Sequence, residues 1–389
     1  MSAAQSRLRV GPAAAVAFAV VLALTLIALV VLNDARAAAQ QQPKCGDTIT
    51  TDATLHHNLV NCPNNGIVIG ADDVTLDLNY HSIDGDGTPA AGCDPRREFC
   101  DVGVLNDGHD GVTVTNGSLR QFGIGVWGLR ASHNRFLGIS ASRNVFFGMV
   151  MFDSTRSVIR NGSFSRNIPP EGDGIGLFSS DHLRIVGNKV RRNPGPGIHV
   201  SRSDQNLIKG NIFSRNGPGI LIEGDRNEVR RNRVRRGGGI RVGPGSHNVI
   251  ARNRTSRASE SIRVEKGRGN LVTRNVVAGA RGPGIRLGIQ RPSIGGANNV
   301  ISRNQVKGSG DDGFLVNEKD NRSVLKHNVA IGAADDGFDI RSHSAKLTGN
   351  QAERNRDLGI AARRGVIDGG GNRASGNGDP RQCTNLVCR

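Results

Sequence analysis

The sequence predicts an all-β fold, a parallel β-helix whose rungs are about 22 residues long. Segments that begin and end with asparagine recur along the chain, and a second motif, Gly-Ile-x-Val or a close variant, recurs between them. No stretch shows a convincing 3.6-residue apolar stripe, which argues against helical repeats. The asparagine segments include NLIKGN (206–211), NEVRRN (227–232), NVIARN (248–253), NLVTRN (270–275) and NVISRN (299–304).

The Gly-Ile-x-Val motif predicts a strand in which the inward and outward side chains can be assigned. Successive side chains of a strand point to opposite faces, so the first and third residues after the glycine are expected to lie inside. Stacked rungs then form one core column from Ile198, Ile220, Ile240, Ile262, Ile285, Phe314 and Phe338. The recurrent asparagine is expected to form a ladder in a buried turn, with each amide bonding the neighbouring rungs.

The first 39 residues are expected to be a targeting segment. Arg7 and Arg9 precede an apolar run from residue 13 to residue 32, and small residues follow it. This arrangement is typical of a cleaved signal peptide, but the run is also just long enough to be a retained N-terminal membrane anchor. Either alternative places the rest of the chain outside the cytoplasm, as a secreted or cell-surface protein.

All six cysteines follow the apolar run and form three pairs that are close in sequence. An even number of cysteines in an exported chain favours disulfides. The simplest pairing is Cys45 with Cys62, Cys93 with Cys100, and Cys383 with Cys388. The first and last of these would fasten the two ends of a repeat array.

Domain limits follow from where the repeat is visible. We expect a disulfide-tied N-terminal cap at 40–65, the β-helix of 12 to 13 rungs at 66–375, and a disulfide-tied tail at 376–389. Two stretches interrupt the repeat and are expected to be insertions, at 87–100 and 289–298.

The chain resembles a known superfamily in its first rungs. The segments CGDTITTDATLHHNLVNC (45–62) and NGIVIGADDVTLDLNYHSIDG (65–85), followed by N-x-V-x-x-N rungs, resemble right-handed parallel β-helix repeat proteins of the pectin-lyase-like superfamily. The resemblance implies a right-handed, single-stranded coil. That superfamily contains pectate lyases, polygalacturonases, alginate epimerases and lyases, copper-maturation β-helix proteins and exported proteins without known activity, so the fold alone does not select a function.

The chain is basic, with 51 Lys+Arg against 34 Asp+Glu, and residues 184–307 hold 26 of the former and 6 of the latter. In a β-helix the outward residue of each Gly-Ile-x-Val strand forms a column, and this column contains Arg241, Arg263 and Arg286. Guanidinium groups at successive rungs repel each other unless anions lie along them. A second basic row consists of Arg231, Arg252, Arg274 and Arg303.

Two readings of this charge stay open, a solvated basic surface and a track for an acidic polymer. An acidic polysaccharide or cell-wall polymer is the expected partner because the chain is exported. Aromatic residues make up only 4% of the chain, which argues against single-strand nucleic acid. Contact with a membrane is expected only through the N-terminal anchor, and we expect a monomer.

Two aspartate pairs are one rung apart, in DDGFLV (311–316) and DDGFDI (335–340). In stacked rungs Asp311 lies over Asp335, Asp312 lies over Asp336, and Asp339 points outward. Ca²⁺ accepts six to eight hard oxygen ligands in flexible geometry, so Asp311, Asp335, Asp336 and Asp339 are candidate ligands for a calcium ion. Asp-Gly is also ordinary turn chemistry, and a purely structural role stays open.

The second pair resembles the metal motif D-D-G-F-D of family 9 pectate lyases, with Asp311 at the position of the aspartate on the preceding rung. This resemblance implies Ca²⁺-dependent β-elimination. The lysine base of that family would lie on the following rung, but the strand there reads GIAA (359–362) and the position holds Ala361. The metal half of the site therefore resembles the family, and no catalytic base is assigned.

The sequence thus leaves two hypotheses. In the first, the chain binds or processes an acidic, uronate-type polysaccharide, with Ca²⁺-dependent lyase or epimerase activity as its enzymatic form. In the second, it is a non-catalytic structural protein of the cell surface. The scattered histidines and the three methionines argue against a zinc or copper centre.

Overall fold

The structure, a computed structural model, describes residues 42–88, 92–94, 100–169, 171–289 and 295–389. The chain divides into a unit at Met1–Pro43 and a unit at Lys44–Arg389. The predicted signal or anchor at 1–39 lies outside the described residues. Within those ranges every regular element is a strand, and no helix there is long and apolar enough to cross a membrane.

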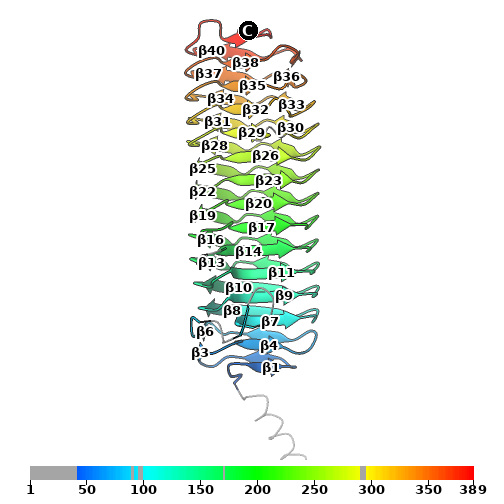
Figure 1. Ribbon diagram of the computed structural model, residues 1–389, viewed down its shortest axis with the longest axis vertical. Helices are drawn as coiled ribbons and strands as arrows, with labels where there is room; N and C mark the ends of the chain where they lie inside the picture. Colours follow the sequence, from blue (N-terminus) through cyan, green and yellow to red (C-terminus); the bar gives the residue numbers. More distant parts are fainter. Residues whose placement is uncertain (1–41, 89–91, 95–99, 170, 290–294) are drawn as a thin grey trace, which may run out of the picture. The chain divides into compact units, whose positions relative to one another are not determined.

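The unit at Lys44–Arg389 is a parallel coil in which one sheet, sheet A, contains 15 strands stacked in chain order (Figure 1). Fifteen strands enclose fourteen turns, slightly more than the 12 to 13 rungs predicted. The strands of sheet A are β1 (Asp47–Ile49), β4 (Ile67–Ile69), β7 (Val102–Asp107), β9 (Ile124–Leu129), β11 (Phe147–Phe152), β14 (Asp173–Phe178), β17 (Ile198–Ser201), β20 (Ile220–Glu223), β23 (Ile240–Pro244), β26 (Ile262–Lys266), β29 (Ile285–Leu287), β32 (Phe314–Val316), β35 (Phe338–Ile340), β38 (Ile360–Ala362) and β41 (Cys383–Thr384).

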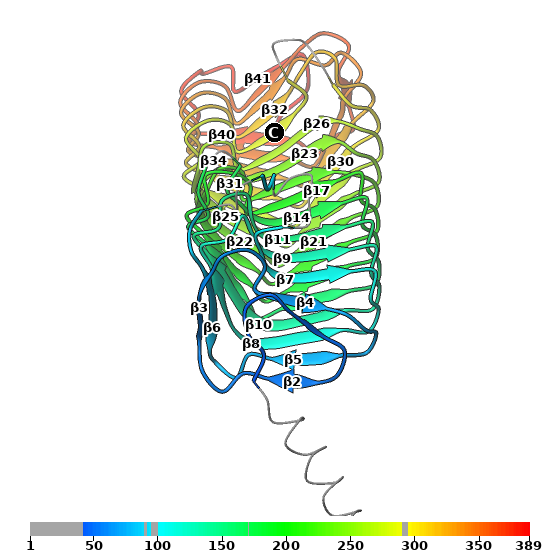
Figure 2. The ribbon, with the colours of Figure 1, turned by 60° about the horizontal axis from the view of Figure 1, so that its bottom comes forward.

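Two further rows of parallel strands complete each turn and together form sheet B. Figure 2 shows strands of these rows and of sheet A on different sides of the coil. The first row is β2 (Ala53–Thr54), β5 (Thr75–Asp77), β8 (Thr113–Arg120), β10 (Arg135–Ser142), β12 (Val158–Arg160), β15 (Arg184–Val186), β18 (Leu207–Lys209), β21 (Glu228–Arg230), β24 (Val249–Ala251), β27 (Leu271–Thr273), β30 (Val300–Ser302), β33 (Val324–Lys326), β36 (Lys346–Thr348) and β39 (Ile367–Asp368).

Along the chain, the second row of sheet B contributes strands that follow those of the first row and precede the next strand of sheet A. It contains β3 (Leu59–Cys62), β6 (Ser82–Gly85), β13 (Ser163–Ser165), β16 (Lys189–Arg191), β19 (Ile212–Asn216), β22 (Arg233–Gly237), β25 (Arg254–Ala258), β28 (Val276–Ala278), β31 (Gln305–Lys307), β34 (Val329–Ile331), β37 (Gln351–Glu353) and β40 (Arg373–Ser375). The long strands β8 and β10 belong to both rows and join them into one sheet.

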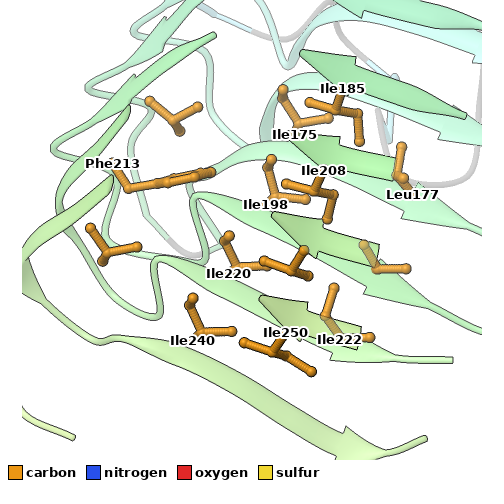
Figure 3. Packing of buried hydrophobic residues seen from close by; sticks show 14 of the residues in the cluster. Ile175, Leu177, Ile185, Ile198, Ile208, Phe213, Ile220, Ile222, Ile240 and Ile250 are labelled. Carbon is orange, nitrogen blue, oxygen red and sulfur yellow. The ribbon is translucent and has the colours of Figure 1, made fainter. Parts of the chain in front are cut away.

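The predicted core column is confirmed. Ile198 pairs with Ile220 on the next strand, and the same alignment continues without a shift to Phe338. All seven side chains are buried, and Figure 3 shows Ile198, Ile220 and Ile240 stacked among the isoleucines of neighbouring turns. The rings of Phe314 and Phe338 stack with their centroids 4.6 Å apart.

Buried asparagines form ladders at the turns, as predicted, but the described coil contains three such ladders. In the longest, the side-chain oxygen of each asparagine accepts the backbone N–H of the asparagine one rung earlier. Asn232 illustrates this, since its Oδ1 lies 2.9 Å from the Asn211 nitrogen and its own nitrogen lies 2.9 Å from Asn253 Oδ1. This ladder runs through Asn188, Asn211, Asn232, Asn253, Asn275, Asn304, Asn328, Asn350 and Asn372.

The coil extends beyond the predicted limits of 66–375 at both ends. Strand β1 pairs with β4, and β41 pairs with β38, so the segments expected to be a cap and a tail contain the first and last strands of sheet A. The three predicted disulfides are present, namely Cys45–Cys62, Cys93–Cys100 and Cys383–Cys388. The predicted insertions lie between β6 and β7 and between β29 and β30, and each is partly outside the described residues.

Candidate functional site

The outer face of sheet A gathers the charged residues that the sequence singled out. We call this surface, formed by the outward side chains on and beside β14 to β38, the outer face. The predicted column is confirmed by the strand register, which aligns Arg241 with Arg263 and Arg263 with Arg286. The same column continues through Leu315 to Asp339 and starts, on this face, at Gly176 and His199.

The three column arginines are held by two glutamates. Arg241 Nη2 lies 3.0 Å from Glu265 Oε2, and Arg263 Nε lies 3.0 Å from Glu265 Oε1. Glu260 accepts hydrogen bonds from Arg263 Nη1 at 2.8 Å and from Arg286 Nη1 at 2.9 Å. Three guanidinium groups against two carboxylates leave one excess positive charge, so repulsion along the column is relieved mainly within the protein.

The sequence reasoning did not anticipate this network, although Glu260 and Glu265 were visible near Arg263. The sequence left open a solvated basic surface and a track for an acidic polymer, and in the structure ion pairs with Glu260 and Glu265 orient these arginines. A groove of about 430 Å³ lies beside Arg241, Glu260 and Arg263 on the same face. Whether these arginines bind a substrate stays a prediction.

A histidine between two carboxylates occupies the same face four rungs before Arg286. His199 Nδ1 lies 3.4 Å from Asp173 Oδ2, and its Nε2 lies 3.3 Å from Glu223 Oε2. Burial alone would lower the histidine pKa, but the hydrogen bonds and charges of Asp173 and Glu223 outweigh it and raise the pKa. Burial also raises the pKa of Asp173, whose side chain is 5% exposed, against the lowering effect of His199.

Aromatic rings adjoin this histidine. The ring of Phe178 meets the imidazole of His199 edge-on, with centroids 5.3 Å apart, and Phe147 packs against Phe178 in the same manner at 5.7 Å. Together with Phe152 they border an outward apolar cluster that contains Leu105, Trp127 and Val150. Aromatic residues are scarce in the chain, yet Trp127, Phe147, Phe152 and Phe178 gather on the neighbouring strands β9, β11 and β14.

The aspartates meet near the C-terminal end of the outer face. Three groups of three carboxylates each have ligand oxygens within 4.8 Å of one another, and the groups are Asp311, Asp312 and Asp335; Asp312, Asp336 and Asp339; and Asp335, Asp336 and Asp357. We call these six residues the aspartate cluster. It brings together all four predicted ligands and adds Asp312 and Asp357.

Asp312, like Asp335 and Asp336, belongs to two of these groups, and only 2% of its surface is exposed. Burial, followed by the charges of four surrounding aspartates, raises its pKa to about 8. Burial also raises the pKa of Asp336 to about 7, although the backbone N–H of Leu358 donates a hydrogen bond to it. The sequence already placed Asp312 over Asp336 in stacked rungs, and this stacking could have identified Asp312 as a member of the aspartate cluster.

Asp339 is partly neutralised by a cation of the protein itself. Its Oδ2 accepts a hydrogen bond from Arg341 Nε at 2.6 Å. Burial raises the pKa of Asp339, and Arg341 acts in the opposite direction. On the next rung Asp339 is aligned with Ala361, so the position at which a lysine base was sought carries a methyl group.

The aspartate cluster and His199 are too far apart to act on one bond. Strands β17 and β32 are separated by five rungs, which corresponds to about 24 Å at the normal strand spacing. An extended polymer lying along the coil could contact both. The second basic row lies elsewhere, since Arg231, Arg252, Arg274 and Arg303 line a groove of about 620 Å³ on sheet B.

Comparison with known proteins supports the fold. No curated protein matches the chain. A solved alpha-1,3-glucanase catalytic domain of family GH87 superposes with a TM-score of 0.53 at 15% identity, covering 71% of this chain and 58% of the glucanase chain. This chain therefore spans less than two thirds of the glucanase domain.

A second solved structure is a variant of the periplasmic alginate epimerase AlgG, with a TM-score of 0.52 at 14% identity, covering 72% of this chain and 74% of the epimerase. A family model described as periplasmic copper-binding protein (NosD) matches residues 237–372. The model described as right handed beta helix region matches residues 44–201 and 173–294, most of the chain. The chain therefore belongs to the right-handed β-helix family.

Proposed function

We propose that this protein binds an acidic, uronate-type polysaccharide along the outer face of sheet A. The proposal rests on one observation: His199, the arginine–glutamate network and the aspartate cluster all lie on the outer face of sheet A. The strands of this face pair without a shift in register. A linear polymer with one carboxylate per sugar presents a repeating anion to such a face, where oriented guanidinium groups can pair with it. The structural similarity to an alginate epimerase and a glucanase supports a carbohydrate ligand.

Export of the protein is part of the proposal. Three disulfides and the partial match to a periplasmic family support a location in the periplasm or outside the cell. Acidic polysaccharides are abundant there, and nucleic acids are not.

The aspartate cluster is proposed to hold Ca²⁺. Its donors are carboxylate oxygens, the hard ligands that Ca²⁺ prefers, and among the described residues no candidate metal group contains a histidine or a cysteine. A copper centre of the kind named in the partial family match would require softer ligands. When bound, the calcium ion would neutralise substrate carboxylates and the aspartates together.

No base for lyase chemistry is assigned at the aspartate cluster, and Lys346, Arg363 and Arg364 stay open as substitutes for the lysine of that family. Ala361 cannot accept a proton, Arg341 is paired with Asp339, and Arg286 is paired with Glu260. The resemblance to family 9 pectate lyases therefore predicts the metal ligands only. It does not extend to the residue that would remove the proton. This observation favours a non-catalytic, binding role for the aspartate cluster itself.

A processing step is instead proposed at His199. Its two carboxylate partners hold the imidazole in one orientation and favour its protonated form, the form in which a histidine can donate a proton to a bound sugar. The aromatic rings of Phe147 and Phe178 supply an apolar floor against which a sugar ring could lie.

The binding proposal is tested with polygalacturonate and alginate in calcium and in EDTA, while the absorbance of unsaturated uronides reports any elimination. We expect Ca²⁺ to raise the melting temperature and to strengthen binding. Asp336→Asn should remove both effects, whereas Asp204→Asn, a stacked aspartate outside the outer face, should keep them. No calcium shift and no binding to either polymer would refute the proposal; binding without product would identify the non-catalytic form.

A further inference from the structure

A row of arginines lies at the C-terminal end of the strands in the second row of sheet B, where the chain leads on to sheet A. We call it the arginine edge. It consists of one arginine on each of six successive rungs, all exposed and all in the left-handed backbone region with φ between 52° and 59°. Its members are Arg143, Arg166, Arg192, Arg215, Arg236 and Arg257.

The backbone does not explain why these residues are arginine. The left-handed region favours glycine and, among other residues, asparagine and aspartate, while a larger L-residue there is strained. On later rungs the same turn position holds glycine, at Gly279, Gly308 and Gly332, with nearly the same φ. Left-handed arginines also occur singly at other turns, such as Arg156 and Arg226, so the backbone angle alone does not distinguish this row. Its distinguishing feature is that arginine occupies the same position on six consecutive rungs, which stacks six like charges.

Within the described part of the chain, the charges of the arginine edge have no ion-pair partner. None of its six members forms an ion pair with any described residue, in contrast to the arginines of the outer face. Successive rungs are separated by about 4.8 Å, so adjacent guanidinium groups repel each other. An external anion with a repeating charge would relieve this repulsion along the whole row.

A groove accompanies the row and carries no acidic residue. It has a volume of about 510 Å³ and is lined by six arginines and two serines. Arg191 and Arg235 add a parallel line of charge at alternate rungs, with Ser165 and Ser214 on the rungs before them. Serine hydroxyls between guanidinium groups suit a polar, hydroxyl-bearing polymer.

We propose that the arginine edge is a second docking surface, distinct from the outer face, which holds a linear anionic polysaccharide parallel to the axis of the coil. The choice of a polysaccharide rests on the proposed function, and the anionic character rests on the row itself. No aromatic side chain lines the groove, whereas single-strand nucleic acid sites use stacking rings. This surface needs no metal ion, because its charge is already positive.

The test uses the full chain in EDTA, so that calcium-dependent binding at the outer face does not contribute. The probe is polygalacturonate, titrated over a range of NaCl concentrations. A variant with Arg166→Asn, Arg192→Asn, Arg215→Asn and Arg236→Asn keeps a residue that accepts the left-handed backbone. We expect at least a tenfold loss of affinity at low salt, a salt slope reduced by about 3 for four lost contacts, and a melting temperature equal to or above that of the parent.

The matched control carries Arg156→Asn, Arg202→Asn, Arg226→Asn and Arg322→Asn. These arginines are also exposed and left-handed, and the change in charge is identical, but they lie outside the arginine edge. The control should bind polygalacturonate like the parent. An equal loss in both variants would overturn the proposal in favour of bulk charge, and tighter binding of duplex DNA than of polygalacturonate would overturn the choice of partner. Because calcium is absent, a failure here leaves the calcium-dependent proposal for the outer face untouched.

Discussion

Asp312 is a buried carboxylate with four other aspartates around it. Ionising it in the folded chain is therefore unfavourable, so the free energy of unfolding depends on pH. Its pKa is raised to about 8 in the folded chain, so the folded state binds its proton more tightly than the unfolded state does. The stabilisation linked to that proton is fully present below about pH 4 and is lost as the pH rises toward 8. Asp336, with a pKa of about 7, acts in the same direction.

We therefore expect the melting temperature in EDTA to fall by several degrees between pH 5 and pH 9. Asp312→Asn should remove a large part of this fall, because an amide does not ionise. Asp204→Asn should leave it in place. Scanning calorimetry at a series of pH values measures the effect, and a melting temperature that rises over this range would contradict the raised pKa values.

His199 provides a second, direct test at the level of one residue. The carboxylates of Asp173 and Glu223 raise its pKa against the effect of burial. Asp173→Asn removes one charge and should bring the pKa down, and Glu223→Gln should act in the same direction. Titration of the imidazole resonances by NMR measures both. A pKa that is unchanged in both variants would show that neither carboxylate controls the proton.

The sequence predicted the outward column but not the Asp173–His199–Glu223 arrangement, and the reason is geometric. Register along a coil follows from the repeat period and the two-residue alternation of a strand. These three side chains, however, lie on three successive rungs and in three different columns, so they meet only diagonally. The pairing of Glu260 and Glu265 with the column arginines is likewise a matter of side-chain reach, which a period does not specify.

At the scale of elements, the asparagine ladders stabilise the turns through hydrogen bonds between each side-chain amide and the neighbouring rungs. Asn232 accepts from the Asn211 backbone and donates to the carbonyl of Ile208 at 2.9 Å and to Asn253 Oδ1 at 3.1 Å. The residue is buried, so removing its amide leaves unsatisfied groups on both neighbouring rungs.

Asn232→Ala should therefore lower the free energy of unfolding by about 3 kcal/mol, because each unsatisfied buried group costs about 1–3 kcal/mol. The exposed Asn321, which makes one local side-chain bond to Lys319, serves as the control, and Asn321→Ala should change stability by less than about 0.5 kcal/mol. Denaturation with guanidinium chloride compares the two. Equal losses would mean that the ladder contributes no more than a surface amide.

The strand order could be predicted from the sequence because the same short motifs recur from rung to rung. Each rung offers a Gly-Ile-x-Val strand, a ladder asparagine and a second alternating strand, and the structure places them in the predicted sequence. The limits at 66 and 375 were too narrow because β1 and β41 lack the motif, and only their hydrogen bonds to β4 and β38 identify them as strands of sheet A. Four of the six arginines of the arginine edge directly precede an asparagine in the sequence, but their left-handed backbone angle is known only from the structure.

At the scale of the whole coil, each turn contacts only its neighbours, so stability is distributed as a chain of nearest-neighbour terms. The ends have one neighbour instead of two. Cys45–Cys62 ties the first turn, and Cys383–Cys388 closes the segment that carries β41. The two disulfides therefore act where the array is weakest, and their effect should not propagate far along the coil.

Replacing Cys383 and Cys388 by serine should accordingly loosen the last turn alone. The backbone N–H groups of Gly359 and Ile360 donate to the carbonyl of Gln382, so opening of β41 exposes them. We expect hydrogen exchange at these two amides to accelerate at least tenfold, while exchange in β23, five strands of sheet A away from β38, stays at the parent rate. Mass spectrometry of peptides from the two regions separates the cases. A matching acceleration in β23 would show that the coil unfolds as one cooperative unit, and the nearest-neighbour description would then fail for this protein.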